Sequence, residues 1–420
     1  MKIAFISYEY PPDTAIGGIA TYVEQAAIML YKRGHYIEVF AGSPSSDETQ
    51  KENDIVIHRV KVKNRQEFSQ KVGMIFVERH GKVKFDVLEA PEIGAEAAKA
   101  VELIPEIPLV IKLHTPSYLL QKLAYLPPSF SLKLRRFLGA IKRGNIPQSF
   151  PTYVYDRDND IERICTLKAD EITAPSLSIA ERVIEDWQLN WQKVVHLPNP
   201  YIPALKLLDI PVTTSNNTIT FVGRLEIRKG ILDLAKAIPL ILRFYPQAKF
   251  RFVGSFLPSP NRKLNMRQYL ERKLKSYLDS LEFVGNLPLE AIPTVLAKTD
   301  ICVFPSVWEN FPNVCLEAMS AARGIVGSSA GGMAELLDGG KVGKLVPPKS
   351  PQSIAKAVIE LLENPDERMR LGAAARQRVL TEYNLERIGE LQEASYLRAI
   401  KRRKGLGARK ENTKTPISIS

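Results

Sequence analysis

Short apolar runs alternate along this chain with longer stretches in which apolar and polar residues repeat with a helical period. In the first half the short runs are KIAFIS, YIEVFAG, DIVIHRV, FDVLEA, PLVIKLH and DEITAP, and segments such as GIATYVEQAAIMLYKRG separate them. Runs of this length that end in turn residues predict buried strands, and their alternation with helical segments is typical of parallel α/β layers. The pattern therefore predicts a doubly wound α/β domain.

A second series of the same kind occupies the rest of the chain. Its short runs are TITFVG, KFRFVG, LEFVG, DICVFP and GIVGSS, with helical segments such as ILDLAKAIPLILRFYP and PQSIAKAVIELLENP between or after them. Residues 200–217 are rich in Pro, Thr, Ser and Asn and show neither period, so they are predicted to connect the two series. We therefore expect an N-terminal domain over residues 1–199, a linker over 200–217 and a C-terminal domain over 218–385.

Three further segments complete the expected organisation. The polar stretch 42–54 is predicted to be a loop. A C-terminal helix over 386–403 is expected to pack back towards the N-terminal domain, and the basic residues 404–420 are predicted to be a disordered tail.

The composition agrees with a two-domain globular protein. A chain of 420 residues has about twice the length of a common domain, and 45% hydrophobic with 25% charged residues is ordinary. Cys165, Cys302 and Cys315 lack metal-ligand spacing, and their odd number argues against a disulfide framework, so a reducing cytoplasm fits best. The N-terminal IAFI is too short for a signal peptide and no segment approaches 18 apolar residues, which predicts a soluble or peripheral protein.

Polar residues with possible chemistry lie at the ends of predicted strands, where open parallel sheets bind ligands. In GRLEIRKG, Arg224 and Lys229 precede a helix and are candidates for holding a diphosphate, although solvated surface cations are the alternative. Gly17 and Gly18 permit close backbone approach to a ligand, or simply form a tight turn; the missing G-x-G-x-x-G disfavours a nicotinamide dehydrogenase. His114 ends the strand PLVIKLH and either faces a cleft or is structural.

Two glutamates, Glu309 and Glu317, stand eight residues apart in SVWENFPNVCLEAM. On one continuous helix they would lie about 80° apart, so they would not share one face well. Asn310 as a cap and Pro312 in the first turn predict a helix that begins near residue 311, with Glu309 on the preceding loop. Glu317 sits in an apolar context and needs a partner, either a ligand hydroxyl or a neighbouring cation or backbone amide.

Together these segments resemble the retaining GT-B glycosyltransferases of family four, over residues 1 to about 385. The specific feature is the Glu309 and Glu317 pair, preceded by VFPS and followed by AM. The order of the other segments is also the one expected for this family: GG near the start, GRLEIRKG, GGMAELL and GKLVPP. The resemblance implies a GT-B fold of the α/β class, in which two Rossmann-like doubly wound domains face each other across a cleft. The N-terminal domain would bind the acceptor and the C-terminal domain a nucleotide sugar.

The resemblance also implies roles for single residues. Arg224 and Lys229 would neutralise the donor diphosphate, and Glu317 would accept hydrogen bonds from the nucleotide ribose. Glu309 would lie against the transferred sugar and His114 near its reacting end. Further donor contacts are expected from Gly17, Gly18, Asn310, Phe311 and Asn313. Many family members carry Gly-Phe-Gly where this chain has Asn310, Phe311 and Pro312, and Pro312 lacks an amide hydrogen.

The function implied is transfer of a sugar, with a hexose favoured, from a nucleotide-diphosphate sugar to an unidentified hydroxyl acceptor, with retention by same-face attack. Two fixed cations can stabilise the leaving group without a metal, and the sequence is interpreted as offering no Asp-x-Asp motif of the metal-dependent kind. No cofactor and no obligatory Mg²⁺ are therefore expected. A nucleotide-sugar epimerase of the same architecture and a catalytically inactive sugar-nucleotide-binding scaffold are the alternatives. A nucleic-acid partner is not expected, because no recognisable reading module is present.

The positive charge of the chain, formally +12, is unevenly distributed. Residues 401–414 hold seven Lys or Arg against one Glu, and residues 121–145 hold six Lys or Arg, no acid and many apolar residues. One interpretation is that both segments contact an anionic membrane, which would place the protein on the inner face of the cell membrane. The other is an ordinary amphipathic helix with solvated cations.

Overall fold

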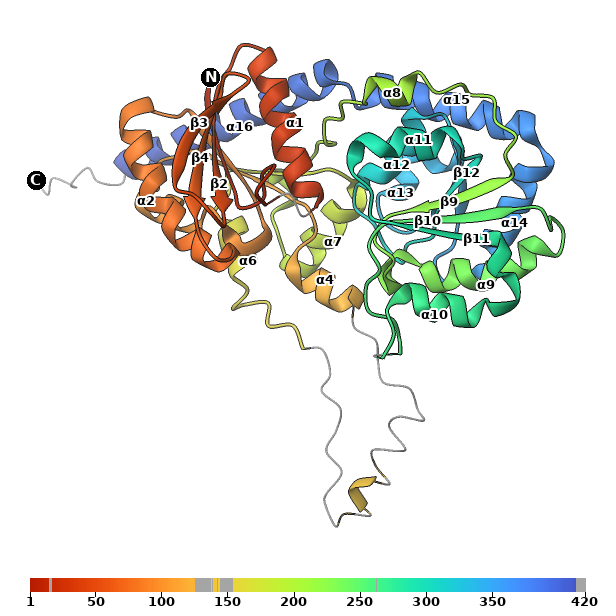
Figure 1. Cartoon of the computed structure of the whole chain (residues 1–420). Coiled ribbons are helices and arrows are strands. Elements are labelled where there is room, and N and C mark those ends of the chain that lie inside the picture. Colours follow the sequence, from red (N-terminus) through yellow and green to blue (C-terminus); the bar gives the residue numbers. More distant parts are fainter. Residues whose placement is uncertain are drawn as a thin grey trace, which may run out of the picture.

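Two sheets form the centre of the protein, one in each half of the chain, and helices cover both faces of each (Figure 1). The computed structural model describes residues 1–14, 17–124, 137, 139–141, 143, 154–261 and 263–412. Most of the segment 121–145, for which membrane contact is one interpretation, lies outside the described residues. The predicted fold class, two Rossmann-like doubly wound α/β domains, is confirmed.

The N-terminal sheet has, in the described residues, eight strands in the order β3-β4-β2-β1-β5-β6-β7-β8. Its strands are β1 (Lys2–Ser7), β2 (Tyr36–Ser43), β3 (Glu48–Glu52), β4 (Ile55–Lys61), β5 (Val87–Pro91), β6 (Leu109–Lys112), β7 (Glu171–Ala174) and β8 (Val194–His196). Neighbouring strands pair in parallel, except that β3 runs antiparallel to β4. Strand β1 pairs with both β2 and β5, so the winding direction of the sheet reverses there.

The side chains of β1 alternate between two apolar cores, as a period of two requires. Ile3 and Phe5 belong to the core shared with α1 and α16, and Ala4 and Ile6 to the core shared with α2 and α7. The helices of this half are α1 (Gly18–Lys32), α2 (Arg65–Val83), α3 (Ala98–Leu103), α4 (Ser117–Ala124), α6 (Ile161–Leu167), α7 (Leu177–Trp187) and the returning α16 (Leu385–Asn412), with 3₁₀ turns η1 (Ile93–Ala95) and η2 (Trp191–Lys193).

The C-terminal sheet has six parallel strands in the described residues, in the order β11-β10-β9-β12-β13-β14. They are β9 (Thr218–Val222), β10 (Lys249–Val253), β11 (Leu281–Gly285), β12 (Ile301–Phe304), β13 (Gly324–Ser328) and β14 (Lys344–Val346). The direction of winding reverses between β9 and β12. One core contains residues of α9 (Ile231–Leu242), α10 (Met266–Lys273) and α14 (Pro351–Glu363). The other contains residues of α8 (Leu205–Leu208), α11 (Ile292–Ala297), α12 (Asn313–Ser320), α13 (Met333–Leu336) and α15 (Pro365–Glu382).

The helices of this half are α8 (Leu205–Leu208), α9 (Ile231–Leu242), α10 (Met266–Lys273), α11 (Ile292–Ala297), α12 (Asn313–Ser320), α13 (Met333–Leu336), α14 (Pro351–Glu363) and α15 (Pro365–Glu382). Four 3₁₀ turns join them to the strands, namely η3 (Ile227–Lys229), η4 (Lys275–Ser280), η5 (Leu289–Ala291) and η6 (Asp338–Gly340). Helix α8 lies inside the predicted linker 200–217, and its Leu207 is buried. The connector is therefore packed against the C-terminal half.

All eleven short runs predicted as strands are strands in the structure. The prediction of a loop over 42–54 is wrong, because this stretch contains β3. The sequence of β3, ETQKE, is polar throughout, and its side chains are largely exposed at the edge of the sheet. An edge strand that buries neither face leaves no hydrophobic alternation to detect.

Helix α16 crosses back from the C-terminal half and packs on the N-terminal sheet (Figure 1). Its Ser395 and Arg398 bind Glu171 of β7, and Arg402 binds the same carboxylate. Arg403 pairs with Asp170 at 2.7 Å. The helix extends to Asn412, so the prediction of a disordered tail from residue 404 is wrong up to that point, because α16 continues without a break.

The pairing of Arg402 and Arg403 also limits the membrane interpretation of residues 401–414. Both guanidinium groups bind carboxylates of the protein itself. They are therefore not available as free cations for a lipid surface. Among the residues that the structure describes, no helix is long and apolar enough to cross a bilayer.

Candidate active site

A cavity lined by most of the predicted site residues lies where the two sheets turn their carboxyl ends towards each other. Arg224 and Lys229 follow β9, and Glu309 follows β12, the two strands between which the C-terminal sheet reverses. Glu9 follows β1 at the corresponding point of the N-terminal sheet. Such reversal points are where open α/β sheets bind ligands. The cavity measures 460 Å³ and is lined by Glu9, Gly17, Gly18, Ile19, Ile93, His114, Thr115, Leu120, Asn199, Gly223, Arg224, Arg228, Lys229, Glu309, Asn310, Phe311, Pro312, Asn313 and Val314.

Glu309 is the centre of a buried polar cluster on the C-terminal wall. The Nζ atom of Lys229 donates to Oε1 of Glu309 at 2.5 Å, and the hydroxyl of Ser306 donates to the same oxygen at 2.8 Å. A guanidinium nitrogen of Arg228 lies 3.8 Å from Oε2. Burial raises the pKa of Glu309, but Lys229 and Arg228 outweigh that effect and hold the pKa below its ordinary value. The carboxylate is therefore charged at neutral pH.

The cations on this wall differ in exposure. The side chain of Arg224 is 52% exposed and pairs with Glu226 at 3.3 Å. Arg228, which was not predicted as a site residue, is 14% exposed, and a guanidinium nitrogen lies 2.9 Å from Glu226. Arg228 stands within GRLEIRKG directly before Lys229, and the 3₁₀ turn η3 brings both side chains to Glu309. The position of Arg228 next to Lys229 is visible in the sequence, but only the geometry of η3 shows that Arg228 belongs to the cluster around Glu309.

The loop that carries Glu309 is fixed by the two glycines of GGMAELL. The amide of Gly332 donates to the carbonyl of Glu309 at 2.8 Å. A methyl group on Gly332 would lie 1.9 Å from the carbonyl oxygen of Asn310. Because this oxygen belongs to the backbone, the loop itself would have to move to relieve the clash. The glycine therefore permits the close contact that holds the loop in place.

Asn310 connects this loop to the N-terminal half. Its amide nitrogen donates to the carbonyl of His114, and its oxygen accepts a hydrogen bond of 2.7 Å from the hydroxyl of Ser176. The prediction that Asn310 caps a helix beginning near residue 311 is therefore wrong. Helix α12 begins at Asn313, and Pro312 precedes it in extended conformation without a side-chain cap. The Asn310 side chain binds across the two halves instead of folding back on its own helix.

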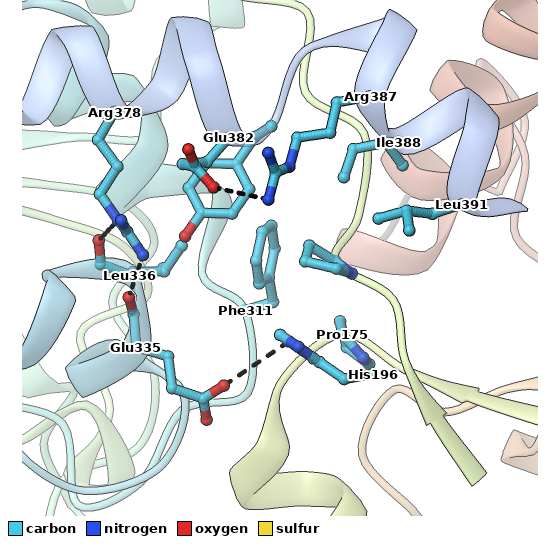
Figure 2. A pocket seen from close by; sticks show the side chains of 12 residues that line it. Pro175, His196, Phe311, Glu335, Leu336, Arg378, Glu382, Arg387, Ile388 and Leu391 are labelled. Atoms are coloured by element: carbon cyan, nitrogen blue, oxygen red, sulfur yellow. Dashed lines mark hydrogen bonds and ion pairs between the residues drawn. The ribbon is translucent and has the colours of Figure 1, made fainter.

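A smaller pocket of 160 Å³, lined in part by Phe311, lies beside a second contact between the two halves (Figure 2). The carboxylate of Glu335 accepts hydrogen bonds from the amides of Leu177 and Ser178, at the start of α7, and lies 3.7 Å from a ring nitrogen of His196. Figure 2 shows Glu335 pointing towards His196. Phe311 lines both this pocket and the large cavity, so it forms part of the wall between them.

His114 faces the cavity from the N-terminal half. Its backbone amide donates to the carboxylate of Glu92. Its ring packs edge to face on the ring of Tyr22, with 5.4 Å between the ring centroids. The Nε2 atom is buried and has no hydrogen-bond partner among the described residues. Burial lowers the pKa of His114 to about 3, with Lys112 and Arg65 adding to the effect. The imidazole is therefore neutral at physiological pH.

The other predicted site residues fall into two groups. Gly17, Gly18, Phe311 and Asn313 line the large cavity, with Gly17 and Gly18 at the start of α1. Glu317 does not line it, but lies one turn further along α12. In the part of the chain that the structure describes, no side chain or amide binds the Glu317 carboxylate, and burial raises its pKa to about 7. A protein partner for Glu317, one of the two alternatives considered, is therefore not found.

The raised pKa of Glu317 predicts a pH-dependent stability. An unfolded glutamate ionises near its ordinary pKa of about 4.3, whereas folded Glu317 ionises at about 7, so stability falls as pH rises between these values. We expect Glu317→Gln to unfold at a higher temperature than the native protein at pH 8, with no difference at pH 4. Thermal unfolding at both pH values measures this. Glu290→Gln, at an exposed position, is the control, and an equal gain in both variants would contradict the buried-carboxyl explanation.

Acidic residues with an Asp-x-Asp spacing occur at 156–160, outside the cavity lining. Asp156 binds the side chain of Asn159, and Asp160 caps α6 and accepts from Tyr155. The described residues contain no group of three His, Cys, Asp or Glu side chains arranged to hold a metal ion. These aspartates thus have local structural contacts.

Two family descriptions match consecutive parts of the chain. Glycosyltransferase Family 4 matches residues 16–205, and Glycosyl transferases group 1 matches residues 209–378. The boundary between the matches falls inside the segment that connects the two sheets. The matches thus correspond to the two α/β halves.

Several known proteins are similar to this chain over nearly its whole length. An uncharacterized glycosyltransferase of Methanocaldococcus jannaschii is 25% identical over 412 residues, covering 93% of this chain and 96% of its own length. The structure of sucrose-phosphate synthase from Thermosynechococcus elongatus has a TM-score of 0.69 at 21% identity, covering 94% and 98% of the two chains. HepE of Anabaena, solved in complex with UDP-glucose, has a TM-score of 0.65 at 16% identity, covering 94% and 100%.

Proposed function

Since this chain belongs to the glycosyltransferases of Family 4 and uses a nucleotide sugar as donor, we propose that it transfers a hexose from a uridine diphosphate sugar to a hydroxyl group, with retention and without a metal ion. The uridine nucleotide and the hexose are suggested by HepE, whose structure contains UDP-glucose. The observation that carries the proposal is the set of three cations, Arg224, Arg228 and Lys229, on one wall of the cleft.

These cations are placed to bind the diphosphate of the donor. They follow β9 and stand before the N-terminus of α9, where backbone amides add positive potential. Cleavage of the bond between sugar and diphosphate leaves negative charge on the leaving group. Fixed cations stabilise that charge without reorganising, and catalysis would then need no metal.

The two glutamates then have separate tasks. Glu309, held by Lys229 and Ser306, lies at the cavity wall and orients the hydroxyls of the transferred sugar. Glu317 lies on α12, and its carboxylate has no partner among the described residues, so ribose hydroxyls of the nucleotide supply the missing donors. His114 is neutral, and its Nε2 atom has no partner in the described part of the chain, so it binds a sugar hydroxyl near the reacting carbon. Glu309 is not required to act as a nucleophile, because same-face attack uses none.

Nucleotide binding tests the proposal directly. At 100 times its dissociation constant, UDP or UDP-glucose should stabilise the protein against thermal unfolding by about 2.7 kcal/mol. The ADP and GDP counterparts at the same concentration should stabilise it less. In calorimetric titrations, Glu317→Ala should weaken UDP binding, whereas Glu309→Gln should leave UDP affinity nearly intact and reduce donor cleavage.

Other outcomes have distinct meanings. Protection by none of these nucleotides would contradict the proposed function. A changed nucleotide sugar, formed without any acceptor, would identify an epimerase instead. Equal loss of UDP affinity in both glutamate variants would contradict the separate tasks of Glu309 and Glu317.

A further inference from the structure

The N-terminal wall of the large cavity carries polar atoms that the protein itself does not satisfy. Oε2 of Glu9, Oδ1 of Asn199 and Nε2 of His114 are buried without a hydrogen-bond partner in the described residues, and all three residues line the cavity. Glu9 and Asn199 are only 8% and 7% exposed. A buried polar atom without a partner costs about 1–3 kcal/mol, so such atoms rarely gather without a ligand to satisfy them.

The oxygen of an ionised carboxylate and the oxygen of an amide both accept hydrogen bonds and cannot donate them. The carboxylate of Glu9 and the amide oxygen of Asn199 therefore complement hydroxyl groups. Between them, Ile19, Ile93 and Leu120 supply apolar surface to the cavity. Hydrogen-bond acceptors beside apolar side chains suit a sugar ring, which presents hydroxyls at its edge and C–H groups on its faces.

The two walls of the cavity differ in charge. The C-terminal wall carries the three cations Arg224, Arg228 and Lys229 and one acid, Glu309. The described residues that line the N-terminal wall include the acid Glu9 but no Lys or Arg. A phosphate on the N-terminal wall would therefore meet a carboxylate. An anionic ligand is favoured only on the opposite wall.

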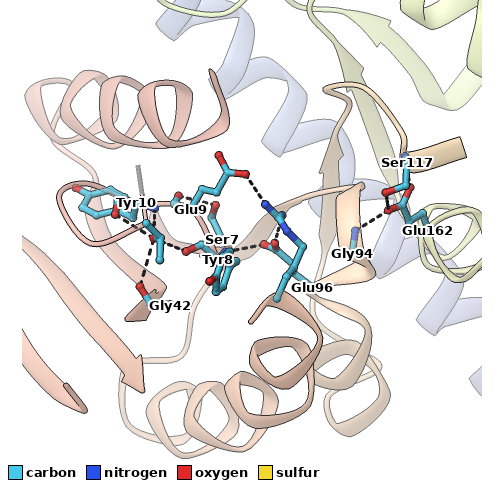
Figure 3. A network of polar contacts seen from close by, with 11 residues as sticks. Ser7, Tyr8, Glu9, Tyr10, Gly42, Gly94, Glu96, Ser117 and Glu162 are labelled. Carbon is cyan, nitrogen blue, oxygen red and sulfur yellow. Dashed lines mark hydrogen bonds and ion pairs between the residues drawn. The ribbon is translucent and has the colours of Figure 1, made fainter. Parts of the chain in front are cut away.

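Arg65, the cation that binds Glu9 behind the N-terminal wall, is paired with two carboxylates. Figure 3 shows Glu9 and Glu96 in one network of polar contacts. The two terminal nitrogens of Arg65 bind Oε1 of Glu9 and Oε1 of Glu96. Glu96 is fully buried, and its second oxygen accepts a hydrogen bond of 2.8 Å from the amide of Tyr8. Arg65 thus fixes the orientation of Glu9, and two carboxylates balance its positive charge.

The position of Glu9 points towards the reacting centre. It follows β1 at the reversal point of the sheet, and a methyl group on Gly17 would lie 3.6 Å from its Oε2 atom. Burial raises the pKa of Glu9, while Arg65, the backbone amide of Ala20 at the start of α1 and, more weakly, Arg224 of the opposite wall oppose that rise. Glu9 lines the same cavity as Arg224 and Glu309 of the opposite wall, so an acceptor bound to Glu9 would lie in the same cavity as the donor.

We propose that the N-terminal wall binds an uncharged sugar as the reacting end of the acceptor, and that Oε2 of Glu9 accepts a hydrogen bond from one of its hydroxyls. This inference rests on the proposed function and narrows the acceptor class to neutral polyhydroxyl groups. Phosphorylated sugars are disfavoured at this position, because Glu9 repels them and Arg65 is paired. Glu9 is thus a specificity-determining residue of the acceptor side.

Binding of simple sugars to the full chain saturated with UDP tests this inference. Saturation-transfer NMR with glucose, maltose and cellobiose should detect binding at tens of millimolar, and glucose 6-phosphate should bind more weakly than glucose. Glu9→Gln should weaken binding of the uncharged sugar at least about tenfold, since it removes a hydrogen bond to a charged group. Glu96→Gln alters the same ion-pair network behind the wall and should leave sugar binding unchanged.

The result that overturns the inference is tighter binding of glucose 6-phosphate than of glucose, or no binding of any uncharged sugar. Equal losses in Glu9→Gln and Glu96→Gln would also overturn it, because they would indicate a structural role. UDP titration of each variant separates these outcomes from failure of the proposed function. If UDP binds and the sugars do not, only the acceptor inference fails.

Discussion

Lys229→Ala is expected to reduce transfer by a factor of about 100 or more and to destabilise the fold at the same time. The first effect follows from the loss of a fixed cation beside the leaving diphosphate. The second follows from Glu309, whose side chain is 9% exposed and accepts from Lys229 at 2.5 Å. Removing one partner of a buried ion pair leaves an uncompensated charge, which costs roughly 3 kcal/mol here because Arg228 remains 3.8 Å away.

Urea unfolding and initial rates of donor cleavage measure the two effects separately. The double change Lys229→Ala with Glu309→Gln should recover most of the stability and none of the activity. Arg224→Ala is the matched control, since its side chain is 52% exposed and pairs only with Glu226 among the described residues. It should lower activity while stability changes by less than about 0.5 kcal/mol. Native-like activity of Lys229→Ala would refute its role at the diphosphate.

Gly230→Ala is expected to destabilise the protein by at least about 3 kcal/mol. Gly230 has φ of +71° between η3 and α9, a conformation that costs an alanine about 1–2 kcal/mol. Its added methyl group would also lie 1.9 Å from the carbonyl oxygen of Pro305, directly after β12. This oxygen is backbone, so β12 or the start of α9 must move, at a further cost of about 1–3 kcal/mol.

The same movement would separate Lys229 from Glu309. Lys229 directly precedes Gly230, and Glu309 lies on the loop that begins at Pro305. A displacement of about 1 Å is enough to cost roughly 100-fold in rate. Gly339→Ala provides a control with almost the same backbone, φ of +64°, and no atom within 4 Å of the added methyl. It should lose only about 1–2 kcal/mol and keep its activity. Equal urea midpoints of the two variants would show that the clash with Pro305 adds nothing to the loss of stability.

The sequence by itself determined the two α/β series and the chemistry at their strand ends. Runs such as KIAFIS and TITFVG became β1 and β9 because a buried parallel strand needs only a local apolar run bounded by turn residues. The spacing of Glu309 and Glu317 and the position of Lys229 after a strand are equally local. Such features are visible in the sequence because residues close along the chain determine them.

Tertiary structure alone decided which of these residues act together. Lys229 and Glu309 are 80 residues apart, Asn310 and Ser176 are 134 apart, and Ser395 and Glu171 are 224 apart. These contacts depend on the order of strands in each sheet and on the placement of the two halves, which no periodicity of 2 or 3.6 residues encodes. Glu9 is the clearest case. Nothing near it in the sequence marks it. Only the packing of β1, α1 and α2 orients one oxygen to Arg65 and buries the other, which has no side-chain partner among the residues that the structure describes.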